Sequence, residues 1–322
     1  SHIAKGNIDK LCDGLTTKNF FVFSDISPNP EVEEIQTLIE LSRSKDFDFI
    51  IGLGGGSVID TCKVLSCLVR INSSITLRNC LLDNEKISYS PIPLIAIPTT
   101  AGTGAEVTPF ATVWEKKESI KYSFTSDKAL PMVAIYDPNL TTSMPFELTL
   151  FTALDSISHA LESMWNKNNN VISTVNSLSS LRLSVKYLPK LLNDLENPHL
   201  RSKLQLASHL SGKSISSTRT AIAHAVSYPL TYKYDVPHGL ACSFMLSNII
   251  HDNIDQLDSI FDEKDLLCEV ADMLESFNLK NILSGYLNSD ELMLMLKSMR
   301  SNSRAGNYLF DINDKILREY VL

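Results

Sequence analysis

The sequence predicts an α/β domain built on a parallel sheet, followed by an all-helical domain. In the first half of the chain, short and nearly continuous apolar runs alternate with amphipathic segments, as strands and helices do around a buried parallel sheet. From about residue 146 onward, glycine becomes sparse and segments with a helical hydrophobic period follow one another. We therefore predict one domain over 1–145 and a second over 146–322.

The elements of the first domain follow from its apolar runs and turn residues. The opening segment SHIAKGNIDKLCDGL has the composition of a loop and a helix, where a doubly wound domain normally begins with a strand, so we expect further residues to precede Ser1. Strands are predicted over 19–26, 47–55, 91–100 and 131–140. Helices are predicted within 27–45, after a loop, and over 57–70.

The second domain is predicted to consist of helices alone, because only the 3.6-residue period recurs there. The predicted helices span 147–165, 170–194, 200–213, 218–230, 240–254, 264–276, 290–299 and 312–321.

Composition and charge disfavour nucleic-acid-binding, membrane-spanning and secreted proteins. The net charge of −8, without a run of Lys or Arg interleaved with aromatic residues, disfavours a general nucleic-acid binder. The apolar runs are too short to span a bilayer, and the residues of this sequence lead us to expect no secretory signal. Six cysteines without a CxxC pair suit a reducing cytoplasm.

A glycine-rich turn joins the strand over 47–55 to the next helix. Glycine lets the backbone approach a phosphate closely, and a helix N-terminus offers unpaired N–H groups. The segment matches neither the GxGxxG nor the Walker A pattern, so a purely structural turn is the alternative. The candidates for binding a pyrophosphate group are Gly54, Gly55, Gly56 and Ser57.

A second loop, IPTTAGTGAEVTPFATVW (97–114), follows the strand over 91–100. Hydroxyl-bearing and small residues at the carboxyl end of a parallel strand lie where α/β sheets bind ligands. For this loop alone, a solvated loop without a ligand is the alternative. Because the glycine-rich turn also follows a parallel strand, the two segments together favour a shared ligand site. The residues concerned are Thr99, Thr100, Gly102, Thr103, Gly104 and Thr108.

The helical segment ALDSISHALESMW (153–165) carries Asp155 and His159 four residues apart on one face. Their neighbours are apolar, and burying both groups is unfavourable unless each finds a partner. A metal ion satisfies both side chains, and so does a direct Asp–His hydrogen bond.

Two more histidines suit a metal site. His224 lies in an apolar helical segment, and His238 precedes a glycine after a Pro-containing turn. With Asp155 and His159 they would offer one carboxylate and three imidazoles to a first-row divalent metal. Spacing alone does not establish that the two segments meet.

Four motifs occur in order along nearly the whole chain: GGGSVID, PTTAGTGAEVT, LDSISHALE and HAVSYPLTYKYDVPHG. Together they resemble the iron-containing (group III) alcohol dehydrogenases. The resemblance implies a dehydroquinate synthase-like fold, with a dinucleotide-binding α/β domain, a helical metal-binding domain and an active site between them. It further implies NAD(P) and one divalent metal, Fe(II) or Zn(II), as cofactors, and a homodimer is the expected assembly.

The resemblance also implies roles for single residues. It implies metal ligands at Asp155, His159, His224 and His238. The NAD(P) contacts that it implies are Gly55, Gly56, Ser57, Asp60, Thr99, Thr100, Thr103 and Lys121.

The chain departs from the family pattern at Tyr228. Many members carry a histidine at this position, four residues after the third ligand. A phenol, with a reference pKa of about 10, cannot relay protons as an imidazole does near neutral pH. The family residue that discriminates NAD from NADP would precede Ser1, so cofactor preference stays open.

The segments SYPLT, FVFSDISPNPE and RAGNYLFDINDKILREYVL resemble one branch of the family, the phosphonoacetaldehyde reductases (hydroxyethylphosphonate dehydrogenases). A phosphonate dianion needs cations and hydroxyl groups as partners. Arg219 could supply such a cation, and the alternative is that it is an ordinary surface arginine without a role in binding. The candidate substrate anchors are Arg219, Thr220, Ser227 and Tyr228.

The resemblance thus implies a metal-dependent oxidoreductase that transfers hydride between NAD(P)H and an aldehyde, with phosphonoacetaldehyde as the candidate substrate, and the cysteine pattern predicts a cytoplasmic location. The alternatives within the family are a general short-chain alcohol or 1,3-propanediol-type dehydrogenase, and a glycerol- or dehydroquinate-type enzyme. The alternative of another class is an inactive metal-binding protein.

Overall fold

The structure is a computed structural model that describes residues 9, 13–14, 20–71, 75–83, 90–118, 120–298 and 305–310. The chain divides into two compact units, Ser1–Thr99 with Ala105–Asp137, and Thr100–Gly104 with Pro138–Leu322. The boundary predicted between residues 145 and 146 therefore falls later than the division in the structure. One reason is the buried Arg201 guanidinium, which donates a hydrogen bond to the Met144 carbonyl (2.9 Å) and ties the segment before residue 146 to the helical unit.

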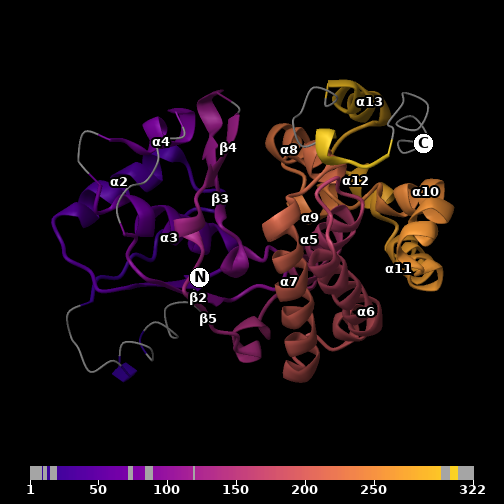
Figure 1. The fold of residues 1–322 in the computed structure, drawn as a ribbon, viewed down its shortest axis with the longest axis horizontal. Helices are drawn as coiled ribbons and strands as arrows, with labels where there is room; N and C mark the ends of the chain where they lie inside the picture. Colours follow the sequence, from indigo (N-terminus) through magenta and orange to yellow (C-terminus); the bar gives the residue numbers. More distant parts are fainter. Residues whose placement is uncertain are drawn as a thin grey trace. The chain divides into compact units, whose positions relative to one another are not determined.

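The first unit is built on a parallel sheet in the order β1-β2-β5, with β1 at Ile50–Gly54, β2 at Leu94–Pro98 and β5 at Val133–Ala134. Helix α3 (Gly56–Leu68) connects β1 to the segment that leads into β2 (Figure 1). Apolar side chains make β1 and β2 suitable for burial from both faces. The predicted parallel α/β arrangement is confirmed, although β5 is much shorter than the predicted strand.

An antiparallel hairpin accompanies the sheet. Strand β3 (Phe110–Glu115) pairs with β4 (Ile120–Thr125), from Phe110 opposite Thr125 to Glu115 opposite Ile120. Neither strand was predicted from the sequence, because polar residues interrupt both runs. The remaining elements of this unit are α2 (Val32–Arg43), α4 (Leu77–Asp83), and the 3₁₀ turns η1 (Ala105–Val107), η2 (Lys116–Glu118) and η3 (Asp127–Ala129).

The strand predicted over 19–26 is wrong for the residues that the structure describes, 20–26, which form no ladder. Phe20, Phe21 and Val22 are 45–48% exposed, so the apolar run is not buried as a central strand would be. An apolar run becomes a strand only where a neighbouring backbone pairs with it, and its composition cannot reveal that partner.

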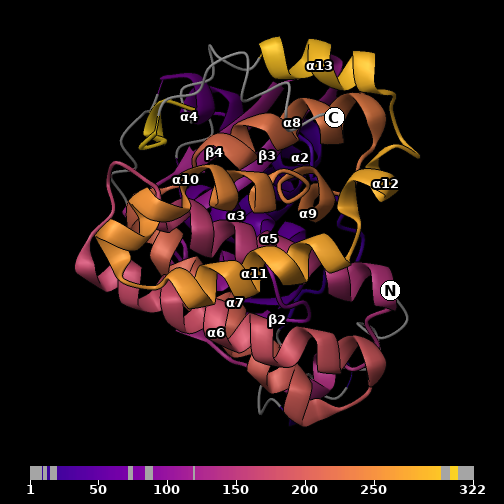
Figure 2. The same cartoon turned by 90° about the vertical axis from the view of Figure 1, so that its right-hand side faces the viewer.

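The second unit is helical throughout the part that the structure describes. Helices α6 and α7 run side by side, as do α10 and α11 (Figure 2). Helix α5 packs against α6, α7 and α9, and its residues Leu154, Ile157 and Leu161 are fully buried. The elements are η4 (Pro138–Thr141), α5 (Phe146–Met164), α6 (Val171–Asn193), α7 (Pro198–Thr218), α8 (Ile222–Tyr234), α9 (His238–Ala241), α10 (Leu246–Phe261), α11 (Lys264–Ser276), α12 (Leu279–Leu283), α13 (Ser289–Ser298) and η6 (Ala305–Asn307).

Most predicted helices are confirmed, with two differences. The helix predicted over 240–254 is divided into α9 and α10, and the helix predicted from 218 begins at Ile222. The later start follows from Arg219, whose backbone adopts φ 68° and ψ 179°, far from helical geometry. The helix predicted over 312–321 lies outside the described residues. Among the described helices, none has the length and apolar character needed to cross a membrane.

Candidate metal centre and cofactor loops

Helix α5 presents three ionisable side chains from its buried face. Asp155, His159 and Glu162 follow at intervals of four and three residues, which places them along one side of the helix. All three are at most 5% exposed. A helix that is buried on nearly every side can hold such groups only if other elements supply their partners.

Helix α8 supplies the first partner, His224, from its first turn. The Ala223 and His224 N–H groups donate to Glu162 Oε1, at 2.5 and 3.3 Å. The His224 Nδ1 atom lies 2.6 Å from Glu162 Oε2. The start of α8 is therefore fastened to α5 by one carboxylate, and the His224 ring is turned so that Nε2 faces Asp155.

The short helix α9 supplies His238, its first residue, after Pro237. The next residue, Gly239, lies against the backbone of α5, where a Cβ would fall 1.7 Å from the Phe151 carbonyl oxygen. Only glycine permits this approach, which brings His238 to the same carboxylate as His224.

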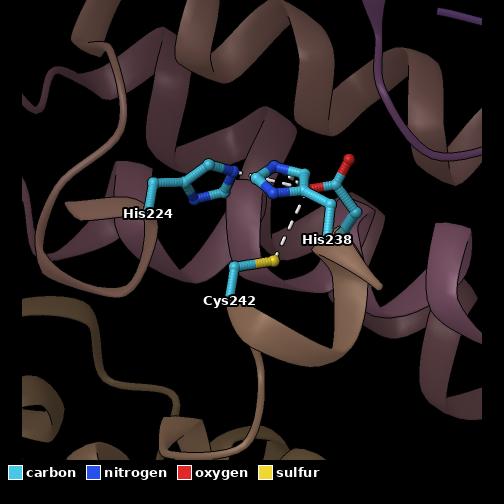
Figure 3. Close-up of side chains that lie close together, drawn as sticks. His224, His238 and Cys242 are labelled. Carbon is cyan, nitrogen blue, oxygen red and sulfur yellow. Dashed lines mark hydrogen bonds and ion pairs between the residues drawn. The ribbon is translucent and has the colours of Figure 1, made fainter. Parts of the chain in front are cut away.

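Three imidazoles converge on one oxygen, Asp155 Oδ1. The Nε2 atoms of His159, His224 and His238 lie 3.4, 3.3 and 3.7 Å from it. The Cys242 thiol also reaches this oxygen, with Sγ at 3.6 Å. Figure 3 shows His224, His238 and Cys242 arranged around the carboxylate. The structure thus brings together the four residues predicted as metal ligands and adds a cysteine.

The donor atoms have the spacing and chemistry that a first-row metal requires. Ligands that share such an ion at about 2.0–2.3 Å lie roughly 3.3–3.8 Å apart in tetrahedral geometry. The distances to Asp155 Oδ1 fall in this range. The buried His224 Nε2 makes no hydrogen bond within the described part of the chain, as expected of a nitrogen whose partner is an ion. A metal therefore fits the residues present.

Two groups of donor atoms lie near Asp155 and His224, the first from His238 and Cys242 and the second from His159. Ligand atoms of Asp155, His224, His238 and Cys242 all lie within 4.8 Å of one another. His159 stacks on His224 instead, with ring centroids 4.8 Å apart, and approaches Asp155 from along α5.

The charges of the cluster depend on one another. Burial lowers the pKa of His159 to about 4 and so keeps this imidazole neutral. Burial alone would raise the pKa of Asp155, but the surrounding histidines outweigh burial and hold this pKa below its usual range. For His224, burial is outweighed by Glu162 and Asp155, which together raise its pKa. Metal ligation needs neutral imidazoles, and His159 already meets that condition.

Sequence reasoning missed two members of this site. Glu162 could have been found from its position seven residues after Asp155, on the same helical face. Cys242 follows His238 by four residues, but a lone cysteine in an apolar segment is usually a packing residue.

The glycine turn of the first unit lies where β1 ends. Gly54 pairs with Pro98 at the carboxyl ends of β1 and β2, and the Thr99 N–H donates to the Gly54 carbonyl (3.0 Å). The structure therefore brings Thr99 to the glycine turn, as the sequence predicted for two loops at one sheet edge. Gly55 is the N-cap of α3 and Gly56 its first residue. Free N–H groups at a helix start are suited to an anion.

The Asp60 carboxylate is engaged on both oxygens. Oδ1 accepts from the Lys63 ammonium (3.2 Å), and Oδ2 accepts from the Thr112 N–H (2.8 Å). Lys63 is fully buried and also donates to the Phe110 carbonyl (2.7 Å) and Thr108 Oγ1 (3.0 Å). Burial lowers the pKa of Lys63, against the effect of Asp60. Sequence reasoning missed this buried cation, which joins α3 to β3.

The other predicted contact residues are more dispersed. Ser57 Oγ accepts from the Asn29 N–H (3.2 Å), and the Lys121 ammonium lies 5.2 Å from the centre of the Trp114 ring. Thr100 and Thr103 belong to the second unit. Their cofactor roles stay predictions.

The predicted substrate anchors lie around the start and middle of α8. Tyr228 stacks on His238, with ring centroids 6.3 Å apart and an interplanar angle of 8°. Arg219 is the C-cap of α7, and its carbonyl accepts hydrogen bonds from Asn166 Nδ2 (3.2 Å) and Thr218 Oγ1 (2.9 Å). Thr220 and Ser227 are buried.

Two family models match consecutive parts of the chain. Residues 1–138 match "Iron-containing alcohol dehydrogenase", and residues 149–296 match "Fe-containing alcohol dehydrogenase family, C-terminal". The chain belongs to the iron-containing alcohol dehydrogenase family. This iron-containing alcohol dehydrogenase homologue has the α/β and helical units of that family, and its candidate metal centre lies in the helical unit.

Curated relatives agree with this family membership. The 1-propanol dehydrogenase PduQ of Citrobacter freundii is 32% identical over 247 residues, which cover 76% of this chain and 63% of that protein. Long-chain-alcohol dehydrogenase 1 of Geobacillus thermodenitrificans is 30% identical, with 76% and 62% covered. The chain thus spans a little less than two thirds of the length of these relatives.

This chain covers a larger share of the similar solved structures than of the curated relatives. The sulfoacetaldehyde reductase of Bifidobacterium kashiwanohense, in complex with NAD⁺, is 28% identical with a TM-score of 0.88, over 99% of this chain and 87% of that one. An iron-containing alcohol dehydrogenase of Thermotoga maritima is 29% identical with a TM-score of 0.80, over 98% and 86%.

Proposed function

We propose that this protein interconverts an aldehyde and an alcohol with NAD(P) and one divalent metal, Fe(II) or Zn(II). The observation that carries the proposal is the convergence of three imidazole Nε2 atoms on Asp155 Oδ1 in a family of alcohol dehydrogenases. The proposed ligands are Asp155, His159, His224 and His238. When bound, the metal supplies a Lewis acid for a carbonyl oxygen, and the cofactor supplies the hydride.

The chain's own residues prepare this chemistry by holding donor atoms in place. Glu162 orients His224, the close packing of Gly239 positions His238, and burial keeps His159 neutral. A site that is ordered before the substrate arrives does not have to reorganise during the reaction.

The proposed cofactor residues lie at the glycine turn and beside it. The N–H groups of Gly56 and Ser57 at the start of α3 suit the pyrophosphate, and Thr99 is held next to them by its bond to Gly54. We propose contacts from Gly55, Asp60, Thr100, Thr103 and Lys121 on the family resemblance alone.

For the substrate we propose a small aldehyde with an anionic head group, with phosphonoacetaldehyde as the first candidate. A phosphonate needs cations and hydroxyl groups, which Arg219 and Tyr228 offer near the proposed ligands His224 and His238 in the chain. The stacking of Tyr228 on His238 supports a role beside the metal. The similarity to a sulfoacetaldehyde reductase supports an anionic two-carbon aldehyde, with a sulfonate as the second candidate head group.

The backbone of Arg219 is consistent with such a role. Its φ of 68° and ψ of 179° lie in a region that side-chain-bearing residues rarely occupy, at a cost of about 1–3 kcal/mol. Hydrogen bonds from Asn166 and Thr218 hold this conformation. Strain of this kind is typical of residues retained for function.

A second candidate function is the oxidation or reduction of a neutral short-chain substrate, which the similarity to a 1-propanol dehydrogenase favours. A cytoplasmic homodimer is part of the proposal in either case.

Steady-state kinetics with phosphonoacetaldehyde, sulfoacetaldehyde and propionaldehyde, each with NADH and NADPH, separates these functions. Two charge-assisted hydrogen bonds should raise kcat/KM for the preferred anion over propionaldehyde by roughly a hundredfold. Arg219→Ala should remove most of that preference and leave the rate with propionaldehyde close to wild type. Equal efficiencies with all three aldehydes would leave a general alcohol dehydrogenase, and no turnover with bound metal and cofactor would favour the inactive alternative.

A further inference from the structure

The Glu162 carboxylate lies at the junction of α5 and α8 and is fully buried. Its contacts divide between its two oxygens. Oε1 accepts the backbone N–H groups of Ala223 (2.5 Å) and His224 (3.3 Å), and Oε2 lies 2.6 Å from His224 Nδ1. One side chain therefore serves both the backbone and the ring of the same histidine.

The first set of contacts stabilises the start of α8. The N-cap residue, Ala221, offers no side-chain acceptor of its own, so the first N–H groups of the helix need an acceptor from elsewhere. Glu162 provides it from α5, and a negative charge is favourable at a helix N-terminus. This contact alone would make Glu162 a structural residue.

The second contact does something different, because it selects a tautomer. A carboxylate can only accept at this distance, so His224 Nδ1 must carry a hydrogen and donate it. In the neutral imidazole the lone pair is then on Nε2, which faces Asp155 at 3.3 Å. A metal-ligating histidine is commonly held by a carboxylate in this way.

We propose that Glu162 is a positioning residue that fixes the tautomer and the ring orientation of His224 for metal binding. The proposal rests on the metal centre described above. It assigns Glu162 no contact with substrate or cofactor and no exchange of protons during the reaction.

The variant Glu162→Gln separates the two roles of this side chain. Glutamine has nearly the same shape but one acceptor oxygen and one NH₂ donor. The backbone N–H groups of Ala223 and His224 cannot become acceptors, so the amide oxygen must stay with them and the NH₂ must face Nδ1. His224 must then accept at Nδ1 and carry its hydrogen on Nε2, where it blocks the metal.

The experiment measures the affinity of purified, metal-stripped protein for Zn(II) and Co(II), in competition with a chelator of known affinity. We expect Glu162→Gln to weaken binding by about 10–100-fold, while far-UV circular dichroism and the melting temperature of the metal-free protein stay close to wild type. The matched control is Glu106→Gln, the same change at a buried glutamate that accepts from Tyr136 in the first unit. It should leave metal affinity unchanged.

A second measurement uses the wild-type protein and does not depend on folding of a variant. In Zn(II)-loaded protein labelled with ¹⁵N-histidine, His224 should show a protonated Nδ1 and a metal-bound Nε2, with its signals assigned by their loss in His224→Gln. A metal-bound Nδ1, or wild-type affinity in folded Glu162→Gln, would overturn the proposal. Failure of wild-type protein to bind either metal would instead remove the proposed metal centre itself.

Discussion

Gly239 and Phe151 lie so close that their backbones leave no room for a side chain. A Cβ on Gly239 would fall 1.7 Å from the Phe151 carbonyl oxygen and 3.0 Å from its Cα. This contact holds α9 against α5 at the point where His238 begins α9 and Asp155 extends from α5. The position of one proposed metal ligand therefore depends on a residue that carries no functional group.

Gly239→Ala tests this dependence. The added methyl group has to move backbone rather than a flexible side chain, so we expect a loss of about 1–3 kcal/mol in the free energy of unfolding of the metal-free protein. Metal affinity should fall as well, because His238 is displaced from Asp155. Urea denaturation and chelator competition measure the two effects. Gly306→Ala, where a Cβ would meet nothing within 4 Å among the described residues, is the control and should change neither quantity.

The stability of the metal-free protein should fall between pH 6.5 and about 4 through His159. Burial lowers the pKa of His159 to about 4, so the unfolded chain takes up a proton at a higher pH than the folded one. Stability linked to this group is complete above pH 6.5 and is lost as the pH falls toward 4, by about 3 kcal/mol at most. The pKa of His224 is raised, so the stability linked to that group is present in full below pH 6.5, is lost only at higher pH, and does not offset the loss in this window.

Urea denaturation at a series of pH values, with His159→Gln as the comparison, isolates the contribution of His159. The wild-type protein should lose stability more steeply than the variant between pH 6.5 and 4. Parallel pH profiles for the two proteins would show that His159 is not held neutral by burial.

Gly56→Val should weaken NAD(P)H binding by roughly tenfold or more, equivalent to about 1.4 kcal/mol, because a branched side chain keeps the pyrophosphate from the start of α3. Metal content should stay at the wild-type level. Fluorescence titration of NADH and NADPH measures the affinity. An unchanged affinity would show that the glycine turn serves only the fold.

Co(II) substitution tests whether Cys242 is a ligand. The thiol is a hydrogen-bond donor to Asp155 Oδ1, and burial, reinforced by Asp155 and Glu162, raises its pKa. Three imidazoles and a carboxylate already suffice for a first-row ion. We therefore expect no sulfur-to-cobalt charge-transfer band in the near ultraviolet, and an unchanged spectrum in Cys242→Ser. An intense band that disappears in Cys242→Ser would add sulfur to the ligand set and favour zinc over iron.

The sequence allowed the two-domain fold and the pairing of Asp155 with His159 to be predicted, because both depend on local periodicity. Helical spacing places the two side chains on one face of α5, and apolar runs mark β1 and β2. Only the resemblance to the family predicted that His224 and His238 lie next to Asp155. This arrangement depends on Gly239 and Glu162, whose contacts join residues far apart in the chain.

Tertiary pairing also explains the failures of prediction in the first unit. The segment at 20–26 has the composition of a strand but no ladder in the described part of the chain, whereas the mixed sequence of β3 and β4 forms a hairpin. Burial of Lys63 could not be predicted either, since its partners Phe110 and Thr108 follow it by more than forty residues.

Metal content is the most direct measurement on the proposed centre. Elemental analysis of purified wild-type protein, reconstituted with Fe(II) or Zn(II) and freed of excess ion, should find about one metal per chain. His224→Ala and His238→Ala should each lose most of it while retaining the wild-type circular dichroism spectrum. Full occupancy in both folded variants would contradict the convergence of these two imidazoles on a metal at Asp155.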